Sequence, residues 1–157
     1  MNNFELAVNL TLAKEGVLSD HPNDKGGLTK YGICKTAYPN LDICNLTKEE
    51  AIAIYKRDYW AKARCEELPY PLDVIVFDTA VNHGPVKAVK ILQESLNVVC
   101  DGIIGEKTLK AAREAKNSIY TVYLLNRLYA YAEDSTWKTF RKGWKNRLVQ
   151  LAAEVDA

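Results

Sequence analysis

The 157-residue chain has little of what metal, redox and membrane proteins require. It contains only two histidines, His21 and His83, which argues against a zinc amidase or a zinc peptidase. Its four cysteines lack the CxxC spacing of a zinc site or a redox centre. No segment is long and apolar enough to span a bilayer. We therefore expect a protein that works without a metal ion or another cofactor.

The chain also has little excess charge of either sign, because 21 basic and 20 acidic residues give a net charge of +1. This balance gives no electrostatic case for nucleic-acid binding. The cations are nevertheless concentrated in one stretch near the C-terminus: Lys138, Arg141, Lys142, Lys145 and Arg147. Two interpretations stay open for this stretch, a solvated helix face or a surface for an anionic polymer.

The cysteines and the N-terminus together suggest a reducing compartment. We expect reduced, mostly packed thiols, while a disulfide between the neighbouring Cys34 and Cys44 stays open as an alternative. Glu5 and Asn9 interrupt the first apolar positions and no basic segment precedes them, which is unlike a signal peptide. We therefore expect the protein to stay in the cytoplasm until something releases it.

Helical patterns dominate the chain, which by its length is a single domain. A first helix should end at Glu15 before a Gly16 cap, and Thr47 to Glu50 reads as a capping box. A helix from about Leu72 should end at 82–84, and Pro85 suits the start of the next. A short helix through Leu109 should precede two long ones. Their apolar stripes are marked by Tyr120, Leu124, Arg127 or Leu128, Tyr131, and then Trp137, Phe140, Trp144, Leu148, Leu151 and Val155.

Only the stretch from Leu28 to Ile33 looks like a strand. Gly26 and Gly27 would turn a hairpin in front of it, and Thr29 and Tyr31 would alternate on one face. The predicted fold is therefore mainly α, with a small β-hairpin lobe.

Glu15 is the strongest catalytic candidate in the sequence. It continues the stripe of Phe4, Val8 and Leu12, which faces the core. At the C-terminal end of a helix and on an apolar face, both the helix dipole and desolvation should raise the pKa of its carboxyl group. A carboxylic acid that stays protonated near neutral pH can act as a general acid. The alternative is an ordinary surface glutamate at a helix end.

Two turn aspartates, Asp20 and Asp24, are candidate partners of Glu15. Paired carboxyl groups across a cleft are what hydrolysis of a glycosidic bond requires. Asp24 stands two residues before Gly26 of the glycine pair and is the better placed, whereas Asp20 could simply order the loop. A hydroxyl group at Thr29 could hold a water molecule, and the phenol of Tyr31 could contact a sugar. For both residues the alternative is ordinary strand propensity.

These residues resemble the motif of glycoside hydrolase family 108, the N-acetylmuramidases of bacteriophages and prophages that also occur as secretion-associated muramidases. The resemblance begins with Glu15, Asp24 and the stretches 26–29 and 31–33. It continues through Phe77 to Gly84, Gln93, Asp101 to Gly105 and Thr108, and closes at Phe140 to Arg147. It therefore covers nearly the whole chain. It divides the single domain 1–157 into a catalytic part, 1–85, and a C-terminal helical part, 86–157, which resembles the family's predicted peptidoglycan domain.

The resemblance implies a lysozyme-like fold and cleavage of the β-1,4 bond between N-acetylmuramic acid and N-acetylglucosamine. By analogy with the phage lysozymes of family 24, Glu15 would protonate the leaving oxygen, Asp24 would activate or orient a water molecule, and Thr29 would help to position it. This favours inversion, although the carboxylate separation that decides it is not given by a sequence. A phage endolysin would act as a monomer on bacterial peptidoglycan after release by a companion holin.

Asn82 and His83 stand at the end of a predicted helix, where they could serve as caps. The alternative is that the Asn82 amide binds an acetamido group of the sugar. Three other functions stay in view: a lytic transglycosylase, a non-catalytic peptidoglycan-binding module, and a chitinase. Asp24 and Thr29 argue against the first, because a transglycosylase needs one catalytic acid, and Glu15 argues against the second.

Overall fold

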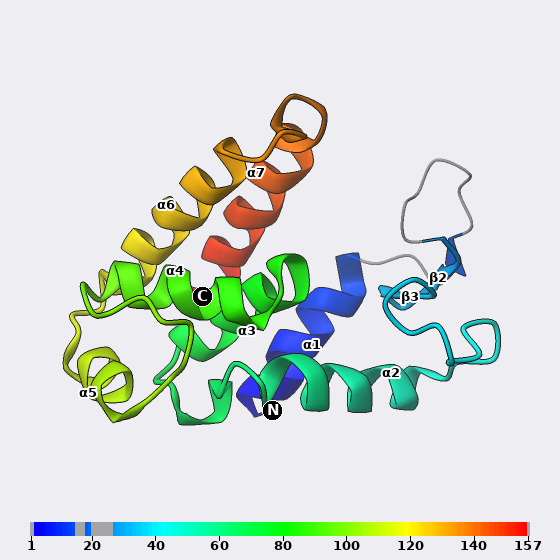
Figure 1. The fold of residues 1–157 in the computed structure, drawn as a ribbon, viewed down its shortest axis with the longest axis horizontal. Helices are drawn as coiled ribbons and strands as arrows, with labels where there is room; N and C mark the ends of the chain where they lie inside the picture. The colour runs from blue at the N-terminus through cyan, green and yellow to red at the C-terminus, as the bar shows by residue number, and fades with distance from the viewer. Residues whose placement is uncertain (1, 15–17, 20–26, 157) are drawn as a thin grey trace.

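The computed structural model of the protein has helix α3 (Leu72–His83) at its centre (Figure 1). The structure describes residues 2–14, 18–19 and 27–156. The sequence of α3 is apolar on nearly every side, and all its residues from 72 to 80 are buried. Because such a helix must be enclosed by other elements, the rest of the chain is built around it.

Elements from the first half of the chain cover one side of α3. Helix α1 (Asn3–Lys14) lies against it, and α2 (Lys48–Tyr55) runs on into a π-helical turn (Lys56–Trp60), followed by a 3₁₀ turn (Cys65–Glu67). Aromatic rings fill the space between these elements. The ring of Phe77 lies 6.1 Å from those of Phe4 and Tyr55 and 5.7 Å from that of Trp60. This edge-on packing anchors α1 and α2 to the core.

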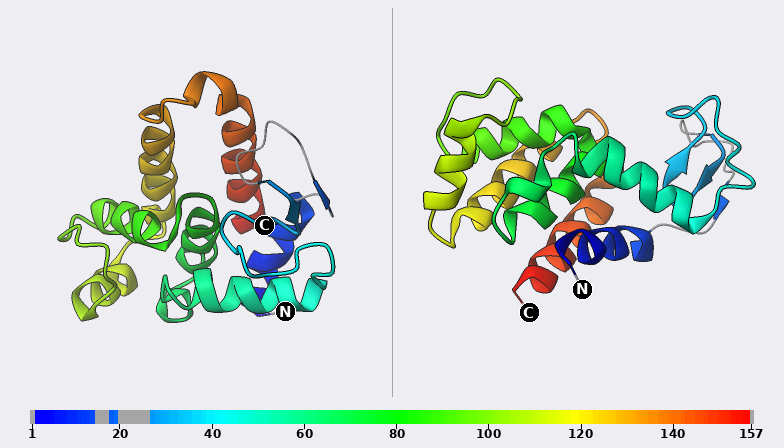
Figure 2. Two further views of the ribbon diagram at one scale, coloured as in Figure 1. Left: turned by 45° about the vertical axis from the view of Figure 1, so that its right-hand side comes forward. Right: turned by 90° about the horizontal axis from the view of Figure 1, so that it is seen from below.

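Four helices from the second half cover the other side: α4 (Pro85–Ser95), α5 (Glu106–Glu114), α6 (Ile119–Ala132) and α7 (Trp137–Val155). Helices α6 and α7 form an antiparallel hairpin that projects from the core (Figures 1 and 2). One cluster of buried residues runs through both halves of the chain, from the first helix to the last. The helices of the second half therefore share the core of α3.

Most helix boundaries agree with the sequence predictions. The Thr47 side chain accepts a hydrogen bond from the backbone N–H of Glu50, and the Glu50 carboxylate accepts one from the backbone N–H of Thr47, as the capping box requires. Helix α4 begins at Pro85 and α3 ends at His83. The predicted stripe of the last helix is only partly right, because Phe140 is 51% exposed while Leu148, Leu151 and Val155 are buried.

The small sheet differs from the prediction. It has three antiparallel strands in the order β1 (Leu18–Ser19), β2 (Thr29–Lys30) and β3 (Ile33–Cys34). The stretch predicted as one strand is broken by Tyr31 and Gly32, which have positive φ angles of 51° and 76°. Two residues of positive φ form the tight hairpin turn that suits the twist of the flanking strands. Thr29 and Tyr31 therefore do not alternate on one strand face, which corrects the prediction.

Gly27, with a φ of 65°, lies just before β2 in the connection from the antiparallel strand β1, where the predicted glycine turn falls. Gly26 lies outside the described residues. All four cysteines carry free thiols, and only Cys65 is buried, which corrects the expectation of mostly packed thiols. Cys44 and Cys100 are exposed. The mainly helical fold with a small sheet is confirmed.

Candidate functional site

The predicted catalytic acids flank α1 and the sheet in the sequence. Glu15 directly follows Lys14, the last residue of α1. Asp20 directly follows β1, and Asp24 stands between β1 and β2. These three acids lie outside the described residues. The buried residues of α1 are Phe4, Ala7, Val8 and Thr11.

Thr29 is the one predicted catalytic residue that the structure describes. It is paired with Ser19 across the β1–β2 ladder, so the two ends of the segment that carries Asp20 and Asp24 are held side by side. The Thr29 hydroxyl donates a hydrogen bond to the carbonyl oxygen of Gly27 at 3.0 Å. Its oxygen keeps lone pairs that can accept a hydrogen bond from a water molecule.

Tyr31 lies at the tip of the β2–β3 hairpin. Its carbonyl oxygen accepts a hydrogen bond from the Tyr55 hydroxyl at 2.9 Å, which ties the hairpin to α2. The ammonium group of Lys30 lies 5.7 Å from the centre of the Tyr31 ring, within the range of a cation–π interaction. The ring is half-buried and packs against the core. Tyr31 thus has a structural role in addition to any contact with a substrate.

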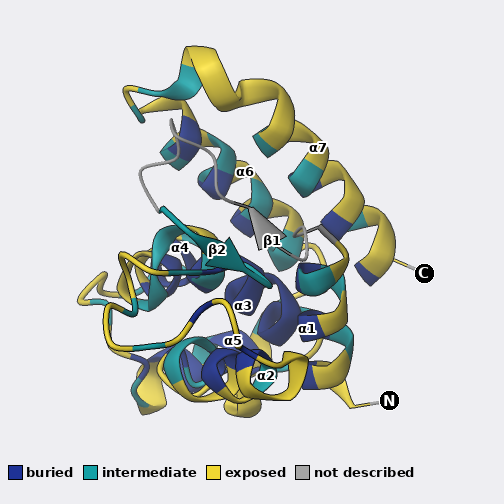
Figure 3. Cartoon of the chain, turned by 90° about the vertical axis from the view of Figure 1, so that its right-hand side faces the viewer, coloured by how far each residue is buried: buried dark blue, intermediate teal, exposed yellow. Residues whose placement is uncertain are grey.

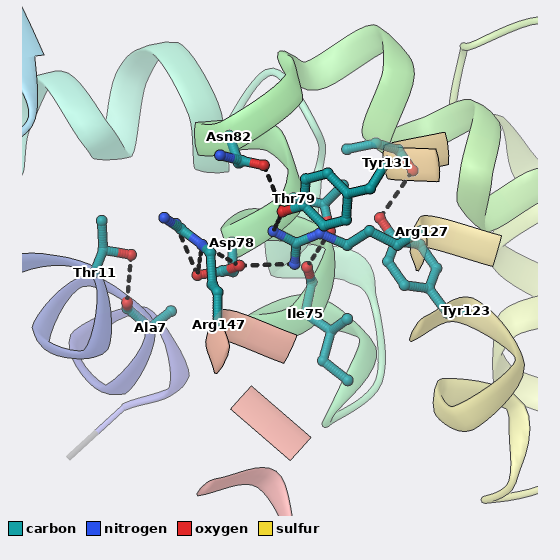
Figure 4. A network of polar contacts seen from close by, with 11 residues as sticks. Ala7, Thr11, Ile75, Asp78, Thr79, Asn82, Tyr123, Arg127, Tyr131 and Arg147 are labelled. Carbon is teal, nitrogen blue, oxygen red and sulfur yellow. Dashed lines mark hydrogen bonds and ion pairs between the residues drawn. The ribbon is translucent and has the colours of Figure 1, made fainter. Parts of the chain in front are cut away.

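Asn82 is exposed at the end of α3, and a buried tyrosine fixes its orientation (Figure 4). The Tyr131 hydroxyl donates to Asn82 Oδ1 at 2.5 Å and accepts a hydrogen bond from Arg127 Nη2 at 3.0 Å. Because the amide oxygen is engaged, the amide nitrogen is the group that Asn82 offers on the outside. An exposed N–H₂ group can donate to a carbonyl oxygen such as that of an acetamido group. Gly84, and not Asn82, caps α3.

An ionic network lies beneath Asn82 and joins three helices. The carboxylate of Asp78 on α3 is 2.7 Å from Arg127 Nη1 on α6 and 3.0 Å from Arg147 Nη2 on α7. The side chains of Asp78 and Arg127 are 3% and 0% exposed, and that of Arg147 is 13% exposed. Burial would lower the pKa of Arg127, but the charge of Asp78 raises it above its ordinary value. The network therefore holds a permanent buried cation against a carboxylate.

His83 completes this region. Its ring lies 4.6 Å from that of Tyr131, and its Nε2 atom is buried without a hydrogen-bond partner among the described residues. Burial and the nearby charge of Arg127 lower the pKa of His83 from 6.5 to about 4. The imidazole is therefore neutral at physiological pH and cannot serve as a cationic ligand there.

The sequence did not single out Asp78, Arg127, Tyr131 and Arg147 as a network. Arg147 was expected at the surface, yet it is largely buried against Asp78. One signal was present, because an arginine on the apolar stripe of a helix needs a buried acid as its partner.

The turn before α5 is held by the buried side chain of Gln93. Gln93 Oε1 accepts a hydrogen bond from the backbone N–H of Gly102, and its Nε2 donates to Asp101 Oδ1 at 2.7 Å. Gly102 has a φ of 79°, which favours glycine. The stretch from Asp101 to Gly105, part of the family resemblance, thus has a structural role.

Within the described part of the chain, no group of three or more histidine, cysteine, aspartate and glutamate side chains is arranged to hold a metal ion. No helix among these residues has the length and apolar character needed to cross a membrane.

Comparison with known proteins identifies two adjoining segments. The family model described as glycosyl hydrolase 108 matches residues 8–84, and the model described as a predicted peptidoglycan domain matches residues 87–149. A solved structure of SagA from Brucella abortus is 34% identical, with a TM-score of 0.89 over 97% of this chain and 92% of that one. No curated protein matches the chain closely enough to count as a relative.

These matches cover both the helical core and the small sheet, and they agree with the lysozyme-like arrangement of the elements. The chain therefore belongs to the glycosyl hydrolase 108 family and is a glycoside hydrolase that acts on peptidoglycan.

Proposed function

We propose that the protein hydrolyses the β-1,4 bond between N-acetylmuramic acid and N-acetylglucosamine. Glu15 acts as the general acid that protonates the leaving oxygen. Asp24 activates a water molecule, which attacks the anomeric carbon as the bond to the leaving oxygen breaks. Thr29 holds that water through its hydroxyl oxygen. A pair of carboxyl groups with these roles is the usual machinery of glycoside hydrolysis.

The observation that carries the proposal is the pairing of Thr29 with Ser19. It brings the start and the end of the acidic segment together, on a sheet that follows α1 within a few residues. The family match over residues 8–84 includes all three proposed catalytic residues. The hydroxyl of Thr29, directed at Gly27, leaves its oxygen free to accept from water.

Four further residues are proposed to support the reaction, three by binding the sugar chain and one by ordering a loop. Asn82 would donate its amide N–H₂ to an acetamido carbonyl group, and its fixed orientation supports this role. Tyr31 would contact a sugar ring at the hairpin tip, and His83 would line the same region as Asn82. Asp20 would order the segment between the strands.

The decisive experiment is mass spectrometry of the products released from purified peptidoglycan. Hydrolysis with water as the acceptor gives reducing N-acetylmuramic acid ends. A lytic transglycosylase would give 1,6-anhydro ends, and a muramidase that also accepts chitin oligosaccharides would cleave them in a parallel assay. Absence of any product, together with retained binding, would indicate a non-catalytic wall-binding module.

Three substitutions test the acids. Glu15→Gln removes the acid at nearly constant shape, so wall lysis should be lost while the protein stays folded and binds wall fragments. Near-normal turnover by a folded Glu15→Gln variant would exclude Glu15 as the acid. Asp24→Asn should lower the rate about 10²-fold or more, whereas Asp20→Asn should cause a milder loss and a shift in the melting temperature. The reverse pattern would exchange the two roles.

We further propose a phage or prophage endolysin as the biological setting. The enzyme would be a monomer that stays in the host cytoplasm until a companion holin opens the inner membrane, and it would then reach the wall. The resemblance of the motif to phage muramidases supports this setting. Expression of the protein with and without a holin, followed by the optical density of the culture, tests it. Lysis without a holin would contradict it.

A further inference from the structure

Four cations form a stripe along the outer side of α7, which we call the basic stripe: Lys138, Arg141, Lys142 and Lys145. Their spacing of three, four and seven residues from the first places them on one side of a helix. All four are exposed, and none of them forms an ion pair with a described acid. Figure 3 shows that most of the outward surface of α7 is exposed.

The packing of α7 fixes the direction of the basic stripe. The ring of Trp144 stacks on that of Tyr131 from α6, with centroids 4.4 Å apart and an angle of 18° between the planes. Leu148 and Leu151 continue this packed side into the core. At 100° per residue, the stripe lies to one side of that packed face. The four charges are therefore held in a fixed array on a rigid element.

Stability alone does not explain this array. Lys138 lies in the first turn of α7, where the partial positive charge of the helix dipole disfavours cations. The first turn of α7 contains no acid that could compensate. Like charges three and four residues apart destabilise a helix further. The remainder of the chain is net negative, so the stripe is a local concentration of positive charge and does not reflect a basic protein.

We propose that the basic stripe binds the carboxylate groups of the peptide stems that branch from the glycan chain. The proposal rests on the proposed function as a peptidoglycan hydrolase, and it names the part of the substrate that this surface recognises. Peptide stems carry free carboxylates and project away from the glycan. An outward surface of separated cations suits them better than it suits the largely neutral sugar backbone. The stripe also lies within residues 87–149, the segment matched by the peptidoglycan domain model.

The test compares intact sacculi with stem-free glycan, which is prepared by removing the peptide stems with an amidase and then converting the muramic acid carboxylates that this exposes to amides. The variant is Lys138→Gln with Lys142→Gln, which removes two of the four charges of the stripe. The matched control is Lys48→Gln with Lys116→Gln, which removes two exposed cations that also lack an ion pair with a described acid. Initial rates of reducing-end release, co-sedimentation with each substrate, and thermal melts are measured at low and high salt.

We expect the stripe variant to raise the apparent KM on intact sacculi about tenfold with kcat unchanged, and to melt no lower than the wild type. On stem-free glycan, the stripe variant and the wild type should agree within about twofold. High salt should weaken the wild type on intact sacculi more than it weakens the variant. The control variant should behave as the wild type on both substrates.

Three results would overturn the proposal. If the stripe variant binds intact sacculi and stem-free glycan equally more weakly than the wild type, the stripe binds the sugar chain. If the stripe variant binds both substrates as tightly as the wild type, the stripe is only a solvated helix face. A loss of binding to vesicles that contain phosphatidylglycerol, without a loss on sacculi, would assign it to a membrane surface. If no substrate is cleaved, the proposed function fails, and co-sedimentation with the two substrates still decides the stripe.

Discussion

Replacement of Asp78 by asparagine is the most informative perturbation of the core. The carboxylate lies 2.7 Å from Arg127 Nη1 and 3.0 Å from Arg147 Nη2, and its side chain is only 3% exposed. The change Asp78→Asn keeps the shape and removes the charge. It leaves the guanidinium group of Arg127, which is 0% exposed, without a counter-charge.

The magnitude follows from the burial of these groups. Removal of one partner from a buried ion pair costs about 3–5 kcal/mol, because the remaining charge stays desolvated. Arg147 is 13% exposed and can recover some hydration, so Arg127 accounts for most of the loss. A domain of this size is stable by about 5–15 kcal/mol. At roughly 2–4 °C per kcal/mol, the melting temperature should fall by about 6–20 °C.

Urea unfolding and thermal melts measure this effect, and an exposed ion pair supplies the control. Glu67 pairs with Arg64 at 2.6 Å, with side chains that are 41% and 39% exposed. The change Glu67→Gln should therefore cost less than about 1 kcal/mol. If Asp78→Asn costs as little as this control, the reasoning about the network is wrong. Addition of Arg127→Met to Asp78→Asn should restore part of the loss, since it removes the stranded charge.

Three other predictions concern single groups. Tyr131→Phe should raise the apparent KM on peptidoglycan about fivefold, because Asn82 loses the hydrogen bond that orients it. The control Tyr123→Phe, which removes another buried hydroxyl group of α6, should leave KM unchanged. The pKa of His83 is about 4 in the folded protein and 6.5 in the unfolded chain. The free energy of unfolding should therefore be highest above pH 6.5 and decrease as the pH falls toward 4, and His83→Gln should weaken this pH dependence in urea unfolding. Thr47→Ala should cost about 1 kcal/mol in the same assay, because the capping box of α2 is complete.

The helices could be predicted from the sequence because their signals are local. The capping box at Thr47 and the proline at position 85 act within one turn of the chain, and both helices begin where these residues place them. The hairpin could not be predicted in this way. Thr29 and Tyr31 alternate in the sequence whether or not a turn intervenes. What stabilises the turn is the Tyr55 hydroxyl group, which is 24 residues away from Tyr31.

The residues of the candidate site also differ in whether local signals or distant contacts determine their positions. Thr29 and Asn82 could be proposed from the sequence because each stands beside a local turn or helix end. Arg147 was missed as a partner of Asp78 because 69 residues separate them. A basic residue at the edge of an apolar stripe is compatible with a surface position until an acid is known to lie beneath it. Pairing over such distances follows from tertiary packing, which sequence periodicity does not encode.

The network also explains why the two family segments do not act as separate modules. Asp78 belongs to the segment 8–84, whereas Arg127 and Arg147 belong to the segment 87–149. A cut at Pro85 would strand a buried carboxylate on one side and a buried cation on the other, and it would expose the apolar surface that α3 buries against α4 and α6. Both losses act in the same direction and exceed what a small domain can tolerate. The segment that the peptidoglycan domain model matches is therefore part of the scaffold that orients Asn82.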